Sequence, residues 1–461
     1  MTGWSWGVAH AVWLASGCAP RPTAPPASEP ELELREAQHG ATCAPSQGQC
    51  QRKDWGSPVR VSEHHEHAFA PQLAVAASGA AIAVWEQDGI FARLYDPATD
   101  AWRSEQELDL PSGGELLEPH VAISDQGQGL AVWRQQAHGT SVVVASAYDH
   151  QALKWRSPTA ISADGEQWEP RVVVDAHGNA VAVWMSGGPA TSIRARRFSS
   201  RDVQWAPVVE VSTTEQVISS LEISVGANGD VIAVWEQGVV AQSIIMASRY
   251  VDATQRWSVP ERLDAAVDAP AATGPQVVSL ESGDTLAAWE DGSGSRHRLV
   301  MARHKGEREQ WTEPQTIAAE PGRPRALAIA AACSGNSIAV WRQDGDDNSR
   351  ILASHYDAAT HTWTQPRVLG TAVEVERESS PQVAIDGCGN ATVIWNTSDA
   401  LEARHYDAAA NEWARSSEPS TQGVVVGATE PHLGLDAQGH VFAVWQQRSS
   451  VPFEICANRS G

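Results

Sequence analysis

One pattern of apolar and polar positions recurs about every 50 residues along most of the chain. Each copy contains a short apolar stretch, such as 80–84 or 180–183, that runs from a glycine into a tryptophan. These tryptophans follow one another at steps of 48 to 54 residues: Trp85, Trp133, Trp184, Trp235, Trp289, Trp341, Trp395 and Trp445. A period of this length is typical of repeated supersecondary units that stack to bury their apolar faces.

Glycine and proline positions divide each copy into two strands. Glycine stands six residues before the tryptophan in every copy: Gly79, Gly127, Gly178, Gly229, Gly283, Gly335, Gly389 and Gly439. Proline stands fourteen residues before it in six copies: Pro71, Pro119, Pro170, Pro275, Pro381 and Pro431. Glycine tolerates positive φ in a tight turn. We therefore expect a β-hairpin whose register is fixed, because a slip of one residue would turn every side chain to the wrong face.

Two further strands are expected after each hairpin. A third apolar stretch carries an alanine in all eight copies and an aromatic residue three positions later in six: Tyr95, Tyr148, Phe198, Tyr250, Tyr356 and Tyr406. A second tryptophan series opens a fourth strand: Trp55, Trp102, Trp155, Trp205, Trp257, Trp311, Trp363 and Trp413. Five of these strands carry proline three residues later: Pro58, Pro158, Pro260, Pro314 and Pro366. Proline cannot donate to a β-ladder, so the fourth strand is predicted to be the outer edge.

Four short antiparallel strands per repeat predict the blade of a β-propeller. The segment Trp55–Pro58 has the pattern of an outer strand with no inner strand before it, and the last copy stops after its third strand. We therefore predict an all-β fold, a single eight-bladed β-propeller of four-stranded antiparallel blades over residues 55–461, closed by the N-terminal outer strand. The alternatives are an open array or two smaller propellers.

The segment 95–102 resembles the turn between the third and fourth strands of kelch repeats, as do 356–363 and 406–413. The kelch double glycine is replaced by Ala-Val-Trp, so this resemblance implies propeller geometry alone. Pyrroloquinoline-quinone dehydrogenases are similar in having eight blades with one tryptophan each. The Thr-Gly of their longer turn is absent here, so their cofactor is not implied. The segment 162–168 is similar to a sialidase Asp-box with a displaced glycine. We expect no cofactor.

The first 18 residues resemble a bacterial lipoprotein signal peptide. An apolar stretch ends in Leu14-Ala15-Ser16-Gly17-Cys18, so the resemblance implies lipidation of Cys18. A plain secretory signal or a misassigned start codon are the alternatives. Residues 19–54 are rich in proline and polar residues and are predicted to form a flexible tether. We thus expect an exported chain, a periplasmic or outer-membrane or cell-surface lipoprotein of a bacterium, attached to the membrane only through its lipid.

Export to an oxidising compartment favours disulfides. Cys43 and Cys50 close a short loop within the tether. Cys333 and Cys388 fall in the glycine turns of adjacent copies, so we predict a bond between them as well. Two reduced turn thiols are the alternative. Cys456 is expected to be a small buried residue.

The charge balance excludes some partners. The chain has 33 Lys and Arg against 56 Asp and Glu, a formal net charge of -23. Nucleic acids and anionic membranes require a basic face, so neither is an expected partner. We expect a monomer that binds a protein or a glycan.

Polar residues recur where the inner strands are predicted to begin, at the channel mouth. Thirteen residues before the first tryptophan series stand Gln72, His120, Arg171, Glu222, Gln276, Gln382 and His432, and just before the prolines stand Glu118, Glu169 and Glu430. Glu86, Glu236 and Glu290 directly follow tryptophans. This pattern predicts a polar funnel that binds a polar ligand, a cation or a peptide loop. The alternative is a solvated rim without a ligand.

Catalysis has little support in the sequence. All five tyrosines occupy the repeat position, and no Gly-x-Ser-x-Gly motif occurs. The segment 62–67 is dense in His and Glu, but no His-Glu-x-x-His helix fixes a metal geometry, so we predict neither a metal site nor catalytic residues. Our first hypothesis is a non-catalytic binding module. The alternative is a glycan-active hydrolase or lyase that uses carboxylates such as Glu118 and Glu169.

Overall fold

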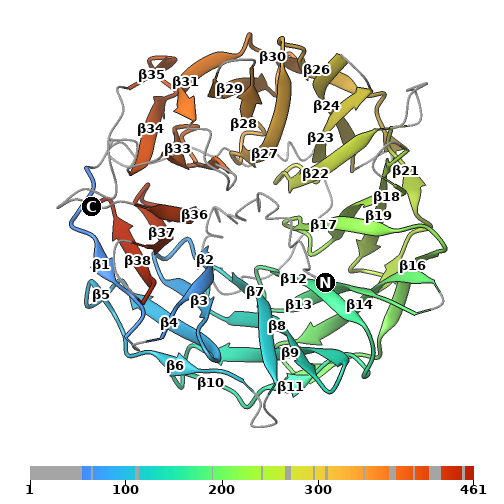
Figure 1. The fold of residues 1–461 in the computed structure, drawn as a ribbon, viewed down its shortest axis with the longest axis vertical. Helices are drawn as coiled ribbons and strands as arrows, with labels where there is room; N and C mark the ends of the chain where they lie inside the picture. The colour runs from blue at the N-terminus through green and yellow to red at the C-terminus, as the bar shows by residue number, and fades with distance from the viewer. Residues whose placement is uncertain are drawn as a thin grey trace, which may run out of the picture.

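The computed structural model is a ring of eight antiparallel sheets without helices in the part of the chain it describes (Figure 1). It describes residues 54–63, 66–109, 114–188, 190–239, 242–264, 271–293, 296–306, 310–345, 348–372, 380–397, 400–414, 427–448 and 452–461. The predicted signal peptide, Cys18, the tether and the Cys43–Cys50 bond therefore lie outside the described residues. Within those ranges, no helix is long and apolar enough to cross a membrane.

The inner two strands of every blade form the predicted hairpin. The innermost strands surround the ring axis in Figure 1: β2 (Phe69–Val75), β7 (Glu115–Ile123), β12 (Gln167–Val174), β17 (Ile218–Val225), β22 (Ala272–Ser279), β27 (Arg323–Ala331), β32 (Gln382–Ile385) and β36 (Ala428–Leu435). The second strands are β3 (Ala81–Glu86), β8 (Gly129–Ala137), β13 (Ala180–Ser186), β18 (Val231–Gln237), β23 (Thr285–Ser293), β28 (Ser337–Asp344), β33 (Ala391–Asn396) and β37 (Val441–Gln447). The glycine of each connecting turn has φ between 76° and 88°, which confirms its predicted role.

The third and fourth strands complete each blade. The third strands are β4 (Ile90–Asp96), β9 (Thr140–Asp149), β14 (Thr191–Ser199), β19 (Ile244–Val251), β24 (Arg296–Lys305), β29 (Ser349–Asp357), β34 (Leu401–Asp407) and β38 (Glu454–Arg459). The fourth begins as β5 (Ala101–Trp102), β10 (Lys154–Trp155), β15 (Gln204–Trp205), β20 (Arg256–Trp257), β25 (Gln310–Trp311), β30 (Thr362–Trp363) and β35 (Glu412–Trp413).

The fourth strand is interrupted in six blades and then resumes against the same third strand. The second pieces are β6 (Gln106–Glu107), β11 (Thr159–Ala160), β16 (Val209–Thr214), β21 (Glu261–Arg262), β26 (Gln315–Ala318) and β31 (Arg367–Ala372). Proline stands in the gap at the predicted position in four of them. Glu105 and Val208 stand at that position in blades 1 and 3, so the interruption does not require proline there.

The two ends of the ring meet in one sheet. Strand β1 (Val59–Arg60) pairs antiparallel with β38, with Val59 opposite Ala457 and Arg60 opposite Cys456. Trp55 forms an isolated bridge with Ser460. These pairings confirm that the N-terminal outer strand closes the eight-bladed ring.

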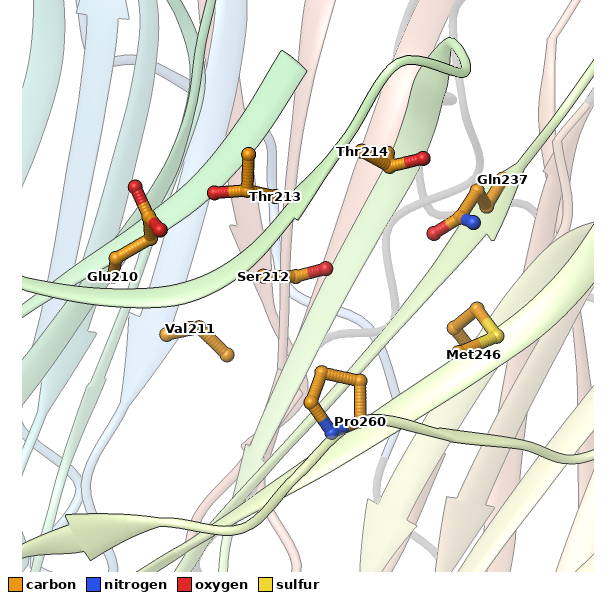
Figure 2. A pocket seen from close by; sticks show the side chains of 8 residues that line it. All are labelled: Glu210, Val211, Ser212, Thr213, Thr214, Gln237, Met246 and Pro260. Carbon is orange, nitrogen blue, oxygen red and sulfur yellow. The ribbon is translucent and has the colours of Figure 1, made fainter. Parts of the chain in front are cut away.

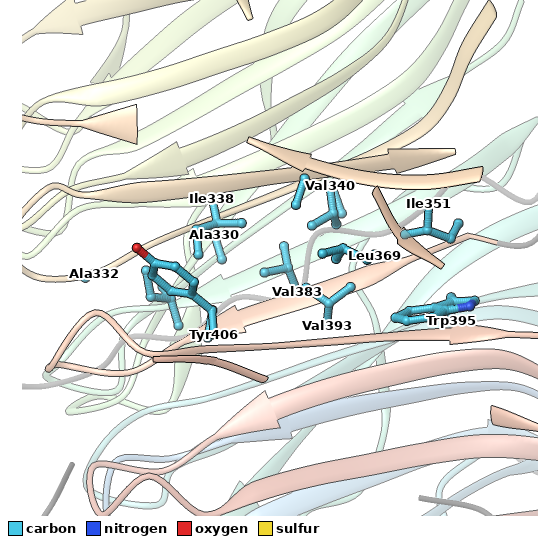
Figure 3. Packing of buried hydrophobic residues seen from close by; sticks show 14 residues of the cluster. Ala330, Ala332, Ile338, Val340, Ile351, Leu369, Val383, Val393, Trp395 and Tyr406 are labelled. Carbon is cyan, nitrogen blue, oxygen red and sulfur yellow. The ribbon is translucent and has the colours of Figure 1, made fainter. Parts of the chain in front are cut away.

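The core consists of eight hydrophobic clusters, one between each pair of adjacent blades. Figure 3 shows the cluster between blades 6 and 7, where Ile338 and Val340 face Val383, Val393 and Trp395. The first-series tryptophans are at most 1% exposed. In four blades the indole N–H donates to a glutamine two residues later, at 2.9 to 3.4 Å: Gln87, Gln237, Gln343 and Gln447. Inter-blade packing therefore carries most of the buried area.

The second-series tryptophans stiffen the outer part of each blade. Seven of them lie half-buried with ring centroids 5.2 to 5.6 Å from the residue at the third-strand aromatic position. Six of those partners are the predicted tyrosines and phenylalanine, and His304 takes the same place in blade 5. These tilted and edge-on contacts favour the turn that joins the third and fourth strands.

Candidate functional site

The first strand of every blade begins, and the second ends, on one face of the ring, which we call the mouth face. In seven blades the inner strand has a β-bulge there, marked by a residue with φ between 46° and 59°: Ala70, Glu118, Glu169, Ser220, Gly274, Ala326 and Glu430. A bulge removes backbone groups from the ladder, so their N–H groups need other partners.

Carboxylates of neighbouring blades supply those partners. Glu86 accepts a hydrogen bond from the Glu118 N–H at 2.6 Å, and Glu118 accepts one from the Glu169 N–H at 2.7 Å. Glu430 accepts from the Ala70 N–H at 3.1 Å, across the interface between blades 8 and 1 where the ring closes. We call each interface between two adjacent blades a seam.

The same contact continues around the ring. Glu169 accepts from the Leu221 N–H at 3.4 Å. Glu236 accepts from the Gly274 N–H, and Glu290 from the Ala326 N–H. Six of the eight seams are thus joined by a carboxylate and a backbone amide of the next blade, so these glutamates have a repeated structural role.

The predicted polar ring lies between the blades. Gln72, Arg171, Glu222, Gln276, Gln382 and His432 are only 1 to 8% exposed, and His120 is half-buried. Several members meet across seams. Gln72 Nε2 lies 3.3 Å from His432 Nε2, the Val172 N–H donates to His120 Nδ1 at 3.4 Å, and Arg171 lies 3.9 Å from Glu222. Most of this ring is therefore not exposed to a ligand, and ligand binding by these residues stays a prediction.

Burial changes the acidity of the mouth-face carboxylates. Loss of hydration raises the pKa of Glu86, Glu222 and Glu290 to about 7 from an ordinary value of 4.5. The pKa of Glu86 is raised further by the nearby charges of Glu118 and Glu430. Burial also raises the pKa of Glu169 and of Glu236. A carboxylate taken out of water favours its neutral form, which is the cause of all five upward shifts.

An aromatic group on the mouth face was not predicted from the sequence. Phe69 at the start of β2 is 40% exposed and lies 5.8 Å from Phe453, measured between ring centroids. His67 packs edge-on against Phe453 at 4.5 Å, and the Arg448 guanidinium lies 5.1 Å from the centre of the same ring. The available signal was that neither phenylalanine occupies the repeat's aromatic position.

The charged side chains of the mouth face differ between blades. In blade 6, Arg342 and Arg325 both approach Asp344, at 2.8 Å and 3.4 Å. Blades 8, 1, 2 and 3 instead carry Glu430, Glu86, Glu118 and Glu169. The charges on the mouth face therefore vary from blade to blade, although the strands beneath them repeat.

The His- and Glu-rich segment 62–67 helps to close the ring. His64 and His65 lie outside the described residues. His67 Nδ1 accepts a hydrogen bond from the Phe453 N–H at 3.0 Å, and Glu63 pairs with Arg93 at 2.7 Å. In the described part of the chain, no group of three or more His, Cys, Asp or Glu side chains could hold a metal ion.

A separate pocket of about 370 Å³ lies at the perimeter between blades 3 and 4 (Figure 2). Strand β16 supplies one wall and blade 4 the other. The lining residues are Glu210, Val211, Ser212, Thr213, Thr214, Gln237, Met246 and Pro260. Apart from the position of Pro260, nothing in the sequence indicates this pocket.

No protein-family model matches the chain, and no curated protein matches it either. Among solved structures, the Dos1 propeller is similar with a TM-score of 0.55 and 8% identity, covering 89% of this chain and 96% of that one. The polysaccharide lyase Uly1 is similar with a TM-score of 0.51 and 9% identity, covering 88% of this chain and 99% of that one. At these identities the likeness shows the propeller fold alone.

Proposed function

We propose that this chain is a non-catalytic binding module, exported and anchored by a lipid on Cys18, that holds a protein or glycan partner on its mouth face. The repeated use of the mouth-face carboxylates carries the proposal. Catalysis requires one blade to differ from the others in its acid and base, whereas six seams use a carboxylate for the same backbone contact. On this proposal the chain acts as a monomer and binds no nucleic acid.

The asymmetric features of the mouth face supply the contact surface. Phe69 offers an exposed ring beside Phe453 and Arg448, and aromatic rings next to a guanidinium are frequent anchors in recognition sites. The charged side chains that differ between blades then orient a partner. Funnel residues such as Gln72 and His432 contribute only where a partner reaches the seams.

Glycan and peptide arrays probed with the purified chain test this proposal. We expect binding to at least one class of probe, and Phe69→Ala should weaken it at least tenfold. Val368→Ala is the matched control, because Val368 is 53% exposed on the perimeter. Binding that survives Phe69→Ala unchanged would place the contact elsewhere.

A hydrolase or lyase that uses Glu118 and Glu169 is the second candidate. The raised pKa of Glu169 fits a general acid. However, Glu118 is held by the Glu169 N–H and by Arg134 at 3.0 Å. Assaying each bound glycan for new reducing ends and for unsaturated products separates the two functions, since either product would establish an enzyme.

We also propose that Cys333 and Cys388 form a disulfide between blades 6 and 7. Cys333 Sγ lies 3.8 Å from the carbonyl oxygen of Gly387, the residue before Cys388. Peptide mapping of the exported protein without reductant should recover the two cysteines in one cross-linked peptide. Recovery of both as free thiols would count against the bond and against export to an oxidising compartment. Cys456 is the internal control, because it is a free thiol whose pKa burial raises to about 12.

A further inference from the structure

Strand β16 is unusual among the outer strands. It has six residues, whereas β6, β11 and β21 have two each, and it pairs with β14 alone. Its other edge therefore presents backbone N–H and C=O groups without a β partner. Natural proteins protect such edges with short strands, charged side chains (lysine above all) or proline. Residues 209–214 contain neither lysine nor proline, and Glu210 is their one charged residue. Strand β31 is equally long but begins with Arg367.

Exposed valines flank this edge. Val209 and Val259 are 46% and 86% exposed, and they lie at the end of the pocket that is farther from the mouth face. At the mouth end, Val217 and Val239 are 57% and 60% exposed, and they are tied together by the Gly238 N–H, which donates to the Val217 carbonyl at 2.8 Å. Six of the ten large hydrophobic residues exposed in the described ranges fall within 203–259. Exposed apolar side chains therefore stand at both ends of the pocket, where an added peptide would cover them.

The pocket beside this edge has a defined chemistry. Figure 2 shows Val211, Met246 and Pro260 on one side, with Glu210 and the hydroxyls of Ser212 and Thr213 above them. Glu210 is exposed and forms no ion pair with the described residues. The Nε of Arg194, its cross-strand neighbour, donates to Ser192 at 3.3 Å. The apolar residues can contact the aliphatic part of a lysine or arginine side chain, and the Glu210 carboxylate can pair with its charged end.

We propose that β16 is a docking edge for an extended peptide of a partner protein, which adds as a strand and places a lysine or arginine in the pocket beside Glu210. The backbone edge supplies main-chain hydrogen bonds, and the pocket supplies selectivity, as in other complexes formed by strand addition. A volume of about 370 Å³ accommodates one long side chain. The net charge of -23 attracts a basic segment from a distance. This site lies between blades 3 and 4 and is separate from the Phe69 contact surface at blades 8 and 1.

Fluorescence anisotropy of the purified chain with labelled hexapeptides tests the proposal. The probes alternate valine and threonine, and each carries a different amino acid at the fourth position. We expect lysine and arginine probes to bind with a Kd at least tenfold below that of aspartate and glutamate probes. Glu210→Lys should abolish that preference, and Glu210→Gln should reduce it. Hydrogen exchange should slow within 209–214 when the lysine probe binds.

Two controls separate this site from general attraction. Glu107 occupies the same position of the outer strand in blade 1, so Glu107→Lys makes the same charge change without the pocket and should leave binding intact. A lysine probe with N-methylated backbone amides should bind at least tenfold more weakly, because it cannot form the ladder.

Four outcomes would overturn the proposal. The first is that acidic probes bind as tightly as the lysine probe, and the second is that the N-methylated lysine probe binds as tightly as the unmethylated one. The third is that Glu107→Lys weakens binding as much as Glu210→Lys does. The fourth is that hydrogen exchange slows outside β16 rather than within it. Analytical ultracentrifugation tests the other possible occupant of the β16 edge, which is a second copy of this chain. If the chain forms a concentration-dependent dimer that the Glu210→Lys substitution dissociates, the occupant is a second copy and the proposal of a partner peptide is overturned.

Discussion

Trp235→Ala should lower the free energy of unfolding by about 3–5 kcal/mol, the usual cost of deleting a large buried aromatic side chain. Trp235 is fully buried between blades 3 and 4, where it packs with Val183, Met185 and Ile223. Alanine would leave a cavity that strands paired on both sides cannot collapse to fill. The substitution would also remove the hydrogen bond from the indole N–H to Gln237.

A urea melt followed by tryptophan fluorescence and circular dichroism measures this effect. Trp257→Ala is the matched control, because Trp257 contacts the same cluster but is only half-buried. We expect a clearly smaller shift of the midpoint for that variant. A midpoint for Trp235→Ala equal to that of the unmodified protein would contradict the idea that inter-blade tryptophans hold the ring together.

Glu290→Gln should stabilise the protein by up to about 3 kcal/mol at pH 8 and have little effect at pH 4.5. Burial raises the pKa of Glu290 to about 7, above its ordinary value of 4.5. The folded state therefore binds this proton more tightly than the unfolded state does. Stability from this group is complete below pH 4.5 and is lost as the pH rises through 7. Glutamine remains neutral and can still accept from the Ala326 N–H.

Thermal melts of both proteins from pH 4.5 to pH 8 measure this dependence. The difference in Tm should grow with pH and level off above pH 7. Glu107→Gln is the control, because it makes the same chemical change at an exposed position on β6. A Glu290→Gln variant that is less stable than the unmodified protein at pH 8 would show that the charged form is stabilised by Arg325 and Arg323 more than burial opposes it.

The order and length of the strands could be predicted from the sequence, because each repeat constrains the spacing of its own glycine and tryptophan. Gly79 and its seven equivalents must adopt positive φ, and Trp85 and its equivalents must fill a seam, so their spacing cannot vary within the hairpin. The closing strand was predictable for the same reason, since Trp55 lacks the inner strand that should precede it. The interruption of the outer strand was not predictable from proline alone, because the gap in blade 1, residues 103–105, contains none.

The candidate site was predicted in composition but not in arrangement. The glutamates before the prolines and after the tryptophans do gather on one face. Their use as acceptors for the next blade depends on the bulges, whose unpaired N–H groups exist only once the sheet has formed. Gln72 and His432 were expected at a polar funnel, and they lie buried at a seam, because strand side chains project from the faces of the sheet and both faces pack against neighbouring blades.

The sequence alone determined the number of blades, the order of strands and the way the ring closes, because each depends on contacts between residues within one repeat or on counting repeats. Tertiary structure decided which surfaces are available to a partner. Phe69 and Phe453 meet only through ring closure, and Glu210 and Met246 share a pocket only because two blades pack side by side. Such contacts join positions that vary from blade to blade, and a repeating pattern carries no information about them.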